Sequence, residues 1–195
     1  SVAIVGSGPS GLAAAQQLNR AGHKVTVYER SEKIGGLLSL GIPDFKLEKQ
    51  VVQRRVDQLA AEGIQFITGV HVGKSIPFSK IEEANDAVLL TGGSTVPRNL
   101  DIPGRDLKGV HYAMDFLTQQ NRVNNGMQIP DEEKITAKDK TVVILGGGDT
   151  GSDCLGTSLR QGATNVYQLE LLPKPPDDRT DTDLWPNWPT ILRTS

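Results

Sequence analysis

Val2-Ala3-Ile4-Val5-Gly6-Ser7-Gly8-Pro9-Ser10-Gly11 places four apolar residues directly before a glycine-rich loop. The apolar run predicts a buried parallel strand, and Leu12–Ala21 predicts the helix that follows the loop. Gly6, Gly8 and Gly11 have the spacing G-x-G-x-x-G, which permits a tight turn, a close approach to a pyrophosphate and packing of helix on strand. Because the start of such a helix offers N–H groups to phosphates, the stretch predicts a dinucleotide-binding βαβ unit.

An acidic residue completes this first unit. Lys24–Tyr28 alternates as a second strand, and Glu29 stands at its end. A carboxylate about 20 residues after the glycines accepts hydrogen bonds from ribose hydroxyls. The alternative, a plain glycine turn beside a surface glutamate, requires all these features to coincide by chance. The predicted nucleotide contacts of this unit are Gly6, Gly8, Pro9, Ser10, Gly11, Glu29 and Arg30.

Two later segments are candidates for the rest of the same ligand site. Gly35-Gly36-Leu37-Leu38 would let the chain run close to a bulky ligand, although an ordinary loop has the same composition. Ala87–Leu90 predicts another buried strand, and Thr91-Gly92 follow its carboxyl end, which in a parallel sheet faces the ligand crevice. A plain turn is the alternative there. Gly36, Leu37, Thr91 and Gly92 are the predicted contacts.

The same layout is repeated farther along the chain. Thr141–Leu145 and Asn165–Leu169 predict strands, with a glycine loop and a helix between them and Glu170 at the end. A structural turn is the alternative for this loop. Asp149 places a negative charge near the phosphates, where it caps the helix through the next N–H groups or orients the nicotinamide side through water. The predicted contacts are Gly146, Gly148, Asp149, Thr150, Gly151 and Glu170.

Glu170 bears on the choice of nicotinamide cofactor. A carboxylate at this place favours a ribose diol and repels a 2′-phosphate, so we expect NADH in preference to NADPH. The nearest cation in the sequence is Lys174. Arg179 or Arg193, if folded back toward Glu170, would reverse the preference.

The pattern predicts an α/β fold with two Rossmann-like domains. We expect residues 1–103 to form the N-terminal part of an FAD-binding domain and residues 104–195 an NAD(P)-binding domain. Residues 47–63 predict an amphipathic helix and residues 110–120 another, with a polar loop over 121–140. The expected buried face of the first of these helices comprises Val51, Val52, Val56, Leu59 and Ala60.

Composition narrows the functional classes. The net charge is −2 with no basic block, which argues against nucleic-acid binding, and no apolar run approaches the roughly 20 residues of a membrane span. The single cysteine, Cys154, excludes an internal disulfide and an iron–sulfur or cysteine-rich zinc site built from this chain alone. We therefore expect a cytoplasmic protein, with a structural role for Cys154. His23, His71 and His111 have no metal-ligand spacing.

Two dinucleotide sites indicate hydride transfer from a nicotinamide to a flavin. The cofactors carry that chemistry, so no protein acid or base is required and no catalytic residue is predicted. Arg54-Arg55 is interpreted as a solvated helix face, with a role beside the flavin or a phosphate as the alternative. Trp185 and Trp188, between prolines, predict a packed loop, with a docking surface as the alternative.

Several segments resemble the glutamate synthase small-subunit family. They are residues Val2–Arg30, Ile34–Leu47, Val51–Gly63, Val96–Leu117, Val142–Val166, Leu169–Pro176 and Trp185–Pro189. The resemblance implies two nucleotide-binding domains of the FAD/NAD(P)-binding pyridine nucleotide-disulfide oxidoreductase type. It also implies that the first glycine loop and Glu29 hold the ADP part of FAD, that Gly36, Leu37 and Thr91-Gly92 line the flavin, and that the second loop and Glu170 hold NAD(P)H.

The resemblance also implies a partner. In the family, electrons pass from FAD through iron–sulfur clusters to FMN in a large subunit or synthase domain, which makes glutamate from 2-oxoglutarate and glutamine. The family's cysteine-rich N-terminal domain and the C-terminal segment that completes the FAD domain lie outside this sequence, so we expect a fragment that cannot make glutamate alone. Leu90 stands where relatives often have alanine. A cousin that serves another acceptor and a non-catalytic nucleotide-binding redox module are the alternatives.

Overall fold

The computed structural model describes residues 1–188 and 191–192. It divides into two compact units, Ser1–Ile135 and Thr136–Ser195. The predicted boundary after residue 103 therefore lies inside the first unit, and the assignment of 1–103 and 104–195 to separate cofactor domains stays a prediction. Pro189 of the tryptophan–proline segment and Arg193 lie outside the described residues.

The first unit contains a four-stranded parallel sheet in the order β3-β2-β1-β4. Its strands are β1 (Val2–Val5), β2 (Val25–Tyr28), β3 (Gln65–Ile67) and β4 (Ala87–Leu90). Val2 of β1 pairs with Val25 on one side and with Ala87 on the other. β1 therefore lies inside the sheet, and its Ala3 and Ile4 are completely buried.

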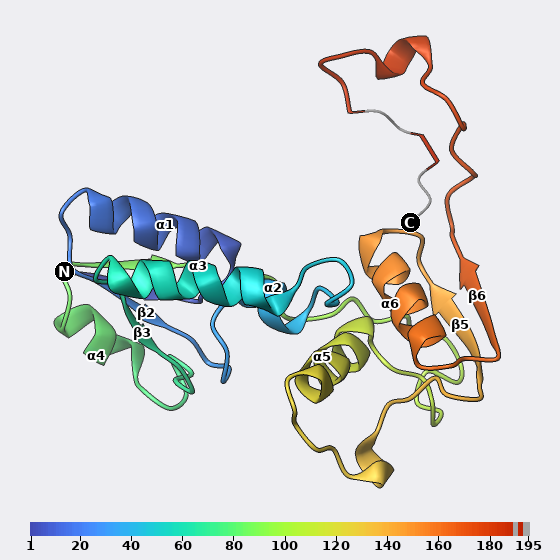
Figure 1. The fold of residues 1–195 in the computed structure, drawn as a ribbon, viewed down its shortest axis with the longest axis horizontal. Helices are drawn as coiled ribbons and strands as arrows, with labels where there is room; N and C mark the ends of the chain where they lie inside the picture. Colours follow the sequence, from blue (N-terminus) through green and yellow to red (C-terminus); the bar gives the residue numbers. More distant parts are fainter. Residues whose placement is uncertain (189–190, 193–195) are drawn as a thin grey trace. The chain divides into compact units, whose positions relative to one another are not determined.

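Two helices pack against the sheet to form the core of this unit. α1 (Pro9–Arg20) and α3 (Lys49–Ala61) run along the strands, as Figure 1 shows. Leu12 and Ala15 of α1 and Leu59 of α3 join a cluster with alternate residues of β1 and β2. This alternation puts one face of each strand against the helices, as the period of two in a strand requires. α2 (Leu37–Leu40), α4 (Phe78–Glu83) and α5 (Ala113–Asn124) complete the helices of the unit, with a short 3-10 helix at Asp131–Glu133.

The second unit repeats the layout on a smaller scale. β5 (Thr141–Leu145) and β6 (Asn165–Leu169) pair in parallel, and α6 (Asp149–Arg160) contacts both strands. Ile144 and Cys154 are buried where α6 meets the strands. Val143 and Tyr167 on the pair are more than half exposed. A second 3-10 helix spans Asp181–Asp183.

The strands and glycine loops of both units confirm the repeated βαβ pattern, but several details differ. Val51 and Ala60 are exposed, because only Val52, Val56 and Leu59 of α3 face the sheet. β4 is parallel as predicted but is an edge strand, so Leu90 is 66% exposed and not buried.

Three helices also depart from the prediction. α5 begins at Ala113 and continues to Asn124, into the segment predicted as a loop. The short helices α2 and α4 lack a long periodic pattern, and the sequence did not predict them.

Candidate functional site

The first glycine loop connects β1 to α1 by a turn that only its glycines permit. Gly6 has φ +106°, a backbone conformation that favours glycine, and its N–H donates to the carbonyl of Tyr28 at 2.8 Å. A Cβ on Gly11 would collide with the carbonyl oxygen of Gly6, which accounts for the third glycine. Gly8 precedes α1, and no side chain caps the helix. The first-turn N–H groups of α1 are thus available to an anion.

Glu29 lies directly beside this loop and accepts hydrogen bonds at both carboxylate oxygens. Its Oε2 accepts the N–H of Ser7 at 3.1 Å and the hydroxyl of Ser7 at 2.5 Å, and its Oε1 accepts the N–H of Ser31 at 2.8 Å. The residue is only 6% exposed. Since each carboxylate oxygen has two lone-pair directions and only Oε1 has a single donor, Oε1 retains acceptor capacity for a ribose hydroxyl.

The ionisation of Glu29 follows from these contacts. Burial raises its pKa, but the hydrogen bonds from the Ser7 hydroxyl, the Ser31 N–H and the Ser7 N–H outweigh burial and leave the pKa below its ordinary value. Glu29 is therefore a carboxylate at neutral pH. An ionised acceptor of this kind suits a vicinal diol.

A cavity of about 500 Å³ opens beside the loop, within the first unit. This volume lies in the usual range of small-molecule sites. The predicted residues that line it are Gly6, Gly8, Pro9, Ser10, Glu29, Arg30, Gly36, Leu37, Thr91 and Gly92. Gly11 is buried behind the loop, where it packs the helix on the turn. The structure therefore brings the three predicted segments to one cavity.

The sequence did not predict the remaining wall of the cavity. It is formed by Ser7, Ser31, Leu40, Gly93, Ser94, Thr95, Val96, Pro97, Tyr112, Met114, Asp115, Thr118 and Arg122. Five of these residues belong to α5 or directly precede it, and they carry no glycine or strand-end signal. Ser7 did have a signal, because it lies between two of the fingerprint glycines.

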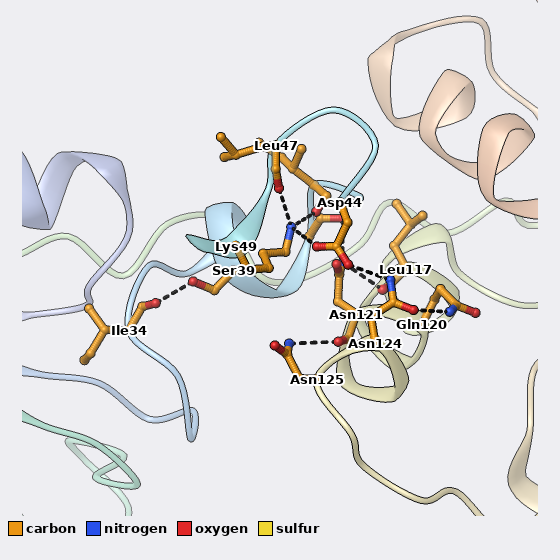
Figure 2. Close-up of polar contacts among 12 residues, drawn as sticks. Ile34, Ser39, Asp44, Leu47, Lys49, Leu117, Gln120, Asn121, Asn124 and Asn125 are labelled. Atoms are coloured by element: carbon orange, nitrogen blue, oxygen red, sulfur yellow. Dashed lines mark hydrogen bonds and ion pairs between the residues drawn. The ribbon is translucent and has the colours of Figure 1, made fainter. Parts of the chain in front are cut away.

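A polar cluster holds α5 against the loop that follows α2, as Figure 2 shows. The side-chain N–H groups of Asn121 donate to the carbonyls of Gly41 at 3.2 Å and Leu117 at 3.0 Å, and Asn121 is 1% exposed. Asn124 donates to Asp44 at 2.8 Å, and Asp44 also forms an ion pair with Lys49 at 3.3 Å. These contacts fix the helix that forms one wall of the cavity.

A second ion pair joins α5 to the segment after β2. The guanidinium of Arg122 donates to both carboxylate oxygens of Glu32, at 2.8 and 3.2 Å. The hydrogen bond from Arg122 lowers the pKa of Glu32. Because both side chains are partly exposed, water screens this pair, and we assign the larger share of the attachment to Asn121.

Replacing Asn121 with alanine is expected to lower the free energy of unfolding by about 2 kcal/mol. The substitution removes the buried hydrogen bonds to the carbonyls of Gly41 and Leu117 and leaves the Gly41 carbonyl without that donor. Asn124→Ala on the same helix is the matched control, since its bond to Asp44 is exposed and should contribute about 0.5 kcal/mol or less. Urea unfolding of both variants measures the difference. Equal losses in the two variants would contradict the role given to Asn121.

The second glycine loop has the same local geometry as the first. Gly146 has φ +117°, and the N–H of Gly147 donates to Glu170 Oε2 at 2.5 Å. The other oxygen of Glu170 accepts the N–H groups of Leu171 at 2.6 Å and Leu172 at 3.1 Å. The hydrogen bonds from Leu172, Leu171 and Gly147 lower the pKa of Glu170. It is therefore a fixed carboxylate at the end of β6, as predicted.

A further hydrogen bond recurs in both units. In the first, the Thr91 hydroxyl donates to the Gly6 carbonyl at 2.8 Å. In the second, the Gln168 amide donates to the Gly146 carbonyl, also at 2.8 Å. Each side chain thus supports the first glycine of its loop, although Thr91 follows β4 and Gln168 belongs to β6.

The neighbours of Glu170 differ in part from expectation. Asp149 is the first residue of α6, and Gly148 occupies the cap position without a side-chain cap, so the proposed cap by Asp149 is not formed. Gly148, Thr150 and Gly151 lie at the start of α6 as predicted. Lys174 pairs with Asp177 at 2.9 Å, and no contact joins it to Glu170.

The other candidate residues have the following environments. Burial, with a smaller contribution from Asp153, raises the pKa of Cys154 to about 11. Arg55 is exposed, as expected, and donates to Gln58 at 2.9 Å, but it also donates to the buried Gln16 of α1. Among the residues that the structure describes, no group of His, Cys, Asp and Glu could hold a metal ion. Trp185 and Trp188 are 88% and 75% exposed, so they do not form the packed loop that we predicted.

Comparison with known proteins finds similarity over nearly the whole chain. The family model described as pyridine nucleotide-disulphide oxidoreductase matches residues 1–184. A curated relative, "Glutamate synthase [NADPH] small chain" of Mycobacterium tuberculosis, is 57% identical over the whole of this chain and 40% of its own length. "Glutamate synthase [NADH]" of Schizosaccharomyces pombe is 52% identical over 98% of this chain and 9% of its own length.

A solved structure extends the comparison to three dimensions. Mycobacterium tuberculosis FprA in complex with NADPH superimposes with a TM-score of 0.69 and 25% identity, over 86% of this chain and 42% of that chain. This chain thus spans well under half the length of these relatives. None of the helices described for residues 1–188 and 191–192 is both long and apolar enough to cross a membrane.

Proposed function

Because this chain belongs to the pyridine nucleotide-disulphide oxidoreductase family, we propose that it is the electron-input region of a glutamate synthase. In this role it transfers hydride from a nicotinamide dinucleotide to FAD. The observation that carries the proposal is the repeated cradle, in which a glycine loop opens a helix and donates an N–H to a strand-end glutamate. The names of the relatives, which are glutamate synthases at 50–57% identity, support the choice of enzyme.

The first cradle fits FAD. Its helix start suits a diphosphate, and Glu29 suits the hydroxyls of the adenosine ribose. The cavity continues past Gly36, Leu37, Thr91 and Gly92, which leaves room for the flavin side of the ligand. Arg30, Pro9 and Ser10 line the same cavity and complete the proposed contacts.

The second cradle fits a nicotinamide dinucleotide. Gly146, Gly148, Thr150 and Gly151 would approach the diphosphate, and Glu170 would accept the ribose hydroxyls. Asp149 is the first residue of α6, where its negative charge interacts favourably with the helix dipole. We propose NADH as the preferred cofactor, because an ionised Glu170 repels a 2′-phosphate.

The residues of this chain orient and bind, and the cofactors supply the chemistry. When bound, FAD would supply the chemistry of hydride acceptance from the reduced nicotinamide and of onward single-electron transfer. Glu29 and Glu170 stay ionised and hold the two riboses, while the glycine loops bring backbone N–H groups close to the diphosphates. No side chain is assigned a proton-transfer role.

The onward electron path requires a partner. We propose that a large subunit or synthase domain with FMN and iron–sulfur clusters receives the electrons and forms glutamate from 2-oxoglutarate and glutamine. This chain has one cysteine and so contributes no cluster of its own. Its location in this proposal is the cytoplasm.

Anaerobic addition of NADH to the purified protein with bound FAD is the first test. The visible flavin absorbance is expected to disappear within the time of mixing or shortly after it. Together with the synthase partner, 2-oxoglutarate and glutamine, the protein should then form glutamate in proportion to NADH consumed. Flavin reduction without glutamate formation would indicate another acceptor. Nucleotide binding without flavin reduction would indicate a non-catalytic module and overturn the proposal.

A further inference from the structure

We propose that the Ser7 hydroxyl is a positioning group that fixes Glu29 for the ribose of FAD and slows release of the nucleotide from the first cradle. This inference rests on the proposed function, because it assumes that FAD occupies the cavity beside Ser7. Ser7 lies between the first two glycines of the loop and is completely buried. The residue at this place is not one of the three glycines whose spacing defines the loop.

The direction of the Ser7 hydrogen bonds follows from their partners. The N–H of Gly35 can only donate, so it donates to Ser7 Oγ, at 3.0 Å. The hydroxyl proton of Ser7 is then directed to Glu29 Oε2 at 2.5 Å, a short bond of the kind formed with a carboxylate. Ser7 thereby connects the glycine loop, the strand-end glutamate and the segment after it.

The second cradle provides an internal comparison. There the N–H of Gly147 makes the same contact with Glu170 that the N–H of Ser7 makes with Glu29. Gly147 has no side chain, so no hydroxyl takes part in this contact. The two cradles share their backbone contacts and differ in the side-chain bond at this one position.

The segment that contains Gly35 and Gly36 packs directly on the glycine loop, so loss of the Ser7 hydroxyl affects both. A Cβ on Gly36 would lie 3.0 Å from the Cα of Gly8, so the segment after Glu29 rests directly on the glycine loop. Without the Ser7 hydroxyl, the buried N–H of Gly35 loses its acceptor and the carboxylate loses a donor. A carboxylate held in place before binding loses less side-chain freedom when it meets the ribose, which strengthens binding.

The difference between the cradles matches the different demands on the two nucleotides. The flavin stays bound through many turnovers, whereas the nicotinamide must leave after each hydride transfer. Ser7 adds a side-chain hydrogen bond in the proposed FAD site, and Gly147 adds none in the proposed nicotinamide site. The slower release is therefore expected for FAD.

Ser7→Ala in the purified flavoprotein is expected to raise the FAD release rate about tenfold, as loss of one hydrogen bond to a charged group predicts. Ser39→Ala is the matched control. Its hydroxyl is also buried and donates a bond of 2.5 Å, but to the carbonyl of Ile34, outside the cavity. If Ser7→Ala does not fold, Ser7→Gly, which copies the second cradle, takes its place.

Two measurements distinguish an effect of Ser7 on the position of Glu29 from a general loss of stability. In a Glu29→Gln background, Ser7→Ala should change FAD release less than twofold, because the group through which Ser7 acts is gone. In the single variant, the loss of FAD affinity on acidification should begin at a higher pH, because the carboxylate has lost a bond that lowers its pKa. The other charged groups around the cavity, which are Arg30, Asp115 and the Glu32–Arg122 pair, are the same in both proteins.

The possible results are distinguishable. A wild-type protein that binds no FAD would overturn the proposed function itself. FAD binding in the wild type with unchanged release in Ser7→Ala would overturn this inference alone. So would a tenfold effect that persists in the Glu29→Gln background, or an equal effect of Ser39→Ala.

Discussion

Gly6→Ala is expected to abolish FAD retention, with an affinity loss of more than about 100-fold. Gly6 has φ +106°, where an alanine is strained, and the added Cβ would lie 2.5 Å from the carbonyl oxygen of Thr91. The clashing oxygen belongs to the backbone of Thr91, which directly follows β4. The alanine must therefore displace either the glycine loop or the end of the strand. Both line the cavity, so the diphosphate and flavin contacts are displaced together.

Gly22→Ala is a control that introduces backbone strain at a positive φ without a steric clash. Gly22 has φ +92°, but no atom lies within 4 Å of the place where its Cβ would stand. It should lower the free energy of unfolding by about 1 kcal/mol and leave FAD content unchanged, whereas Gly6→Ala should lower it by about 3 kcal/mol. Flavin absorbance per protein and thermal unfolding report the two effects. If Gly6→Ala retains FAD at the wild-type level, the placement of the cofactor beside this loop is wrong.

Glu170→Ala is expected to lower the preference for NADH over NADPH by up to about 100-fold. The carboxylate proposed to accept the ribose hydroxyls is lost, which removes a charged hydrogen bond for NADH and a repulsion for NADPH. Because hydrogen bonds from Leu172, Leu171 and Gly147 lower its pKa, Glu170 remains ionised from neutral pH down into the acidic range. The wild-type preference should accordingly be constant across neutral pH and weaken only on strong acidification.

Steady-state reduction of the bound flavin by each nucleotide measures this ratio as kcat/KM. Asp177→Ala is the control for net charge, since Asp177 is a nearby exposed acid paired with Lys174. It should leave the ratio within about twofold of the wild type, as expected for an exposed pair. An unchanged ratio in Glu170→Ala, or an equal change in Asp177→Ala, would refute the role of Glu170 in cofactor choice.

The glycine loops and their strand-end glutamates could be predicted because their geometry is local. A positive φ at Gly6 and Gly146 and a contact from the loop to the next strand depend on residues within one βαβ unit. The same glycine loop and strand-end glutamate occur in both units. Most of the predicted first-unit contacts therefore line one cavity.

Features that depend on distant parts of the chain could not be predicted in this way. Leu90 is exposed because β4 lies at the edge of the sheet. The apolar residues of a strand do not determine its position in the sheet. The α5 wall depends on Asn121 reaching Gly41, 80 residues earlier in the chain. The role of the Ser7 hydroxyl could not be predicted from the glycine spacing, because it depends on the approach of Glu29 and Gly35 to the loop.

The burial of Cys154 determines how readily its thiol can react. With a pKa of about 11, roughly one molecule in ten thousand carries the reactive thiolate at neutral pH. Cys154 is also the only cysteine of the chain, so no dithiol can be assembled from it. Within a family whose name includes disulphide chemistry, the one thiol of this chain is therefore poorly reactive toward oxidants and alkylating reagents. In the proposed function, electrons would therefore pass between the bound cofactors and not through a protein dithiol.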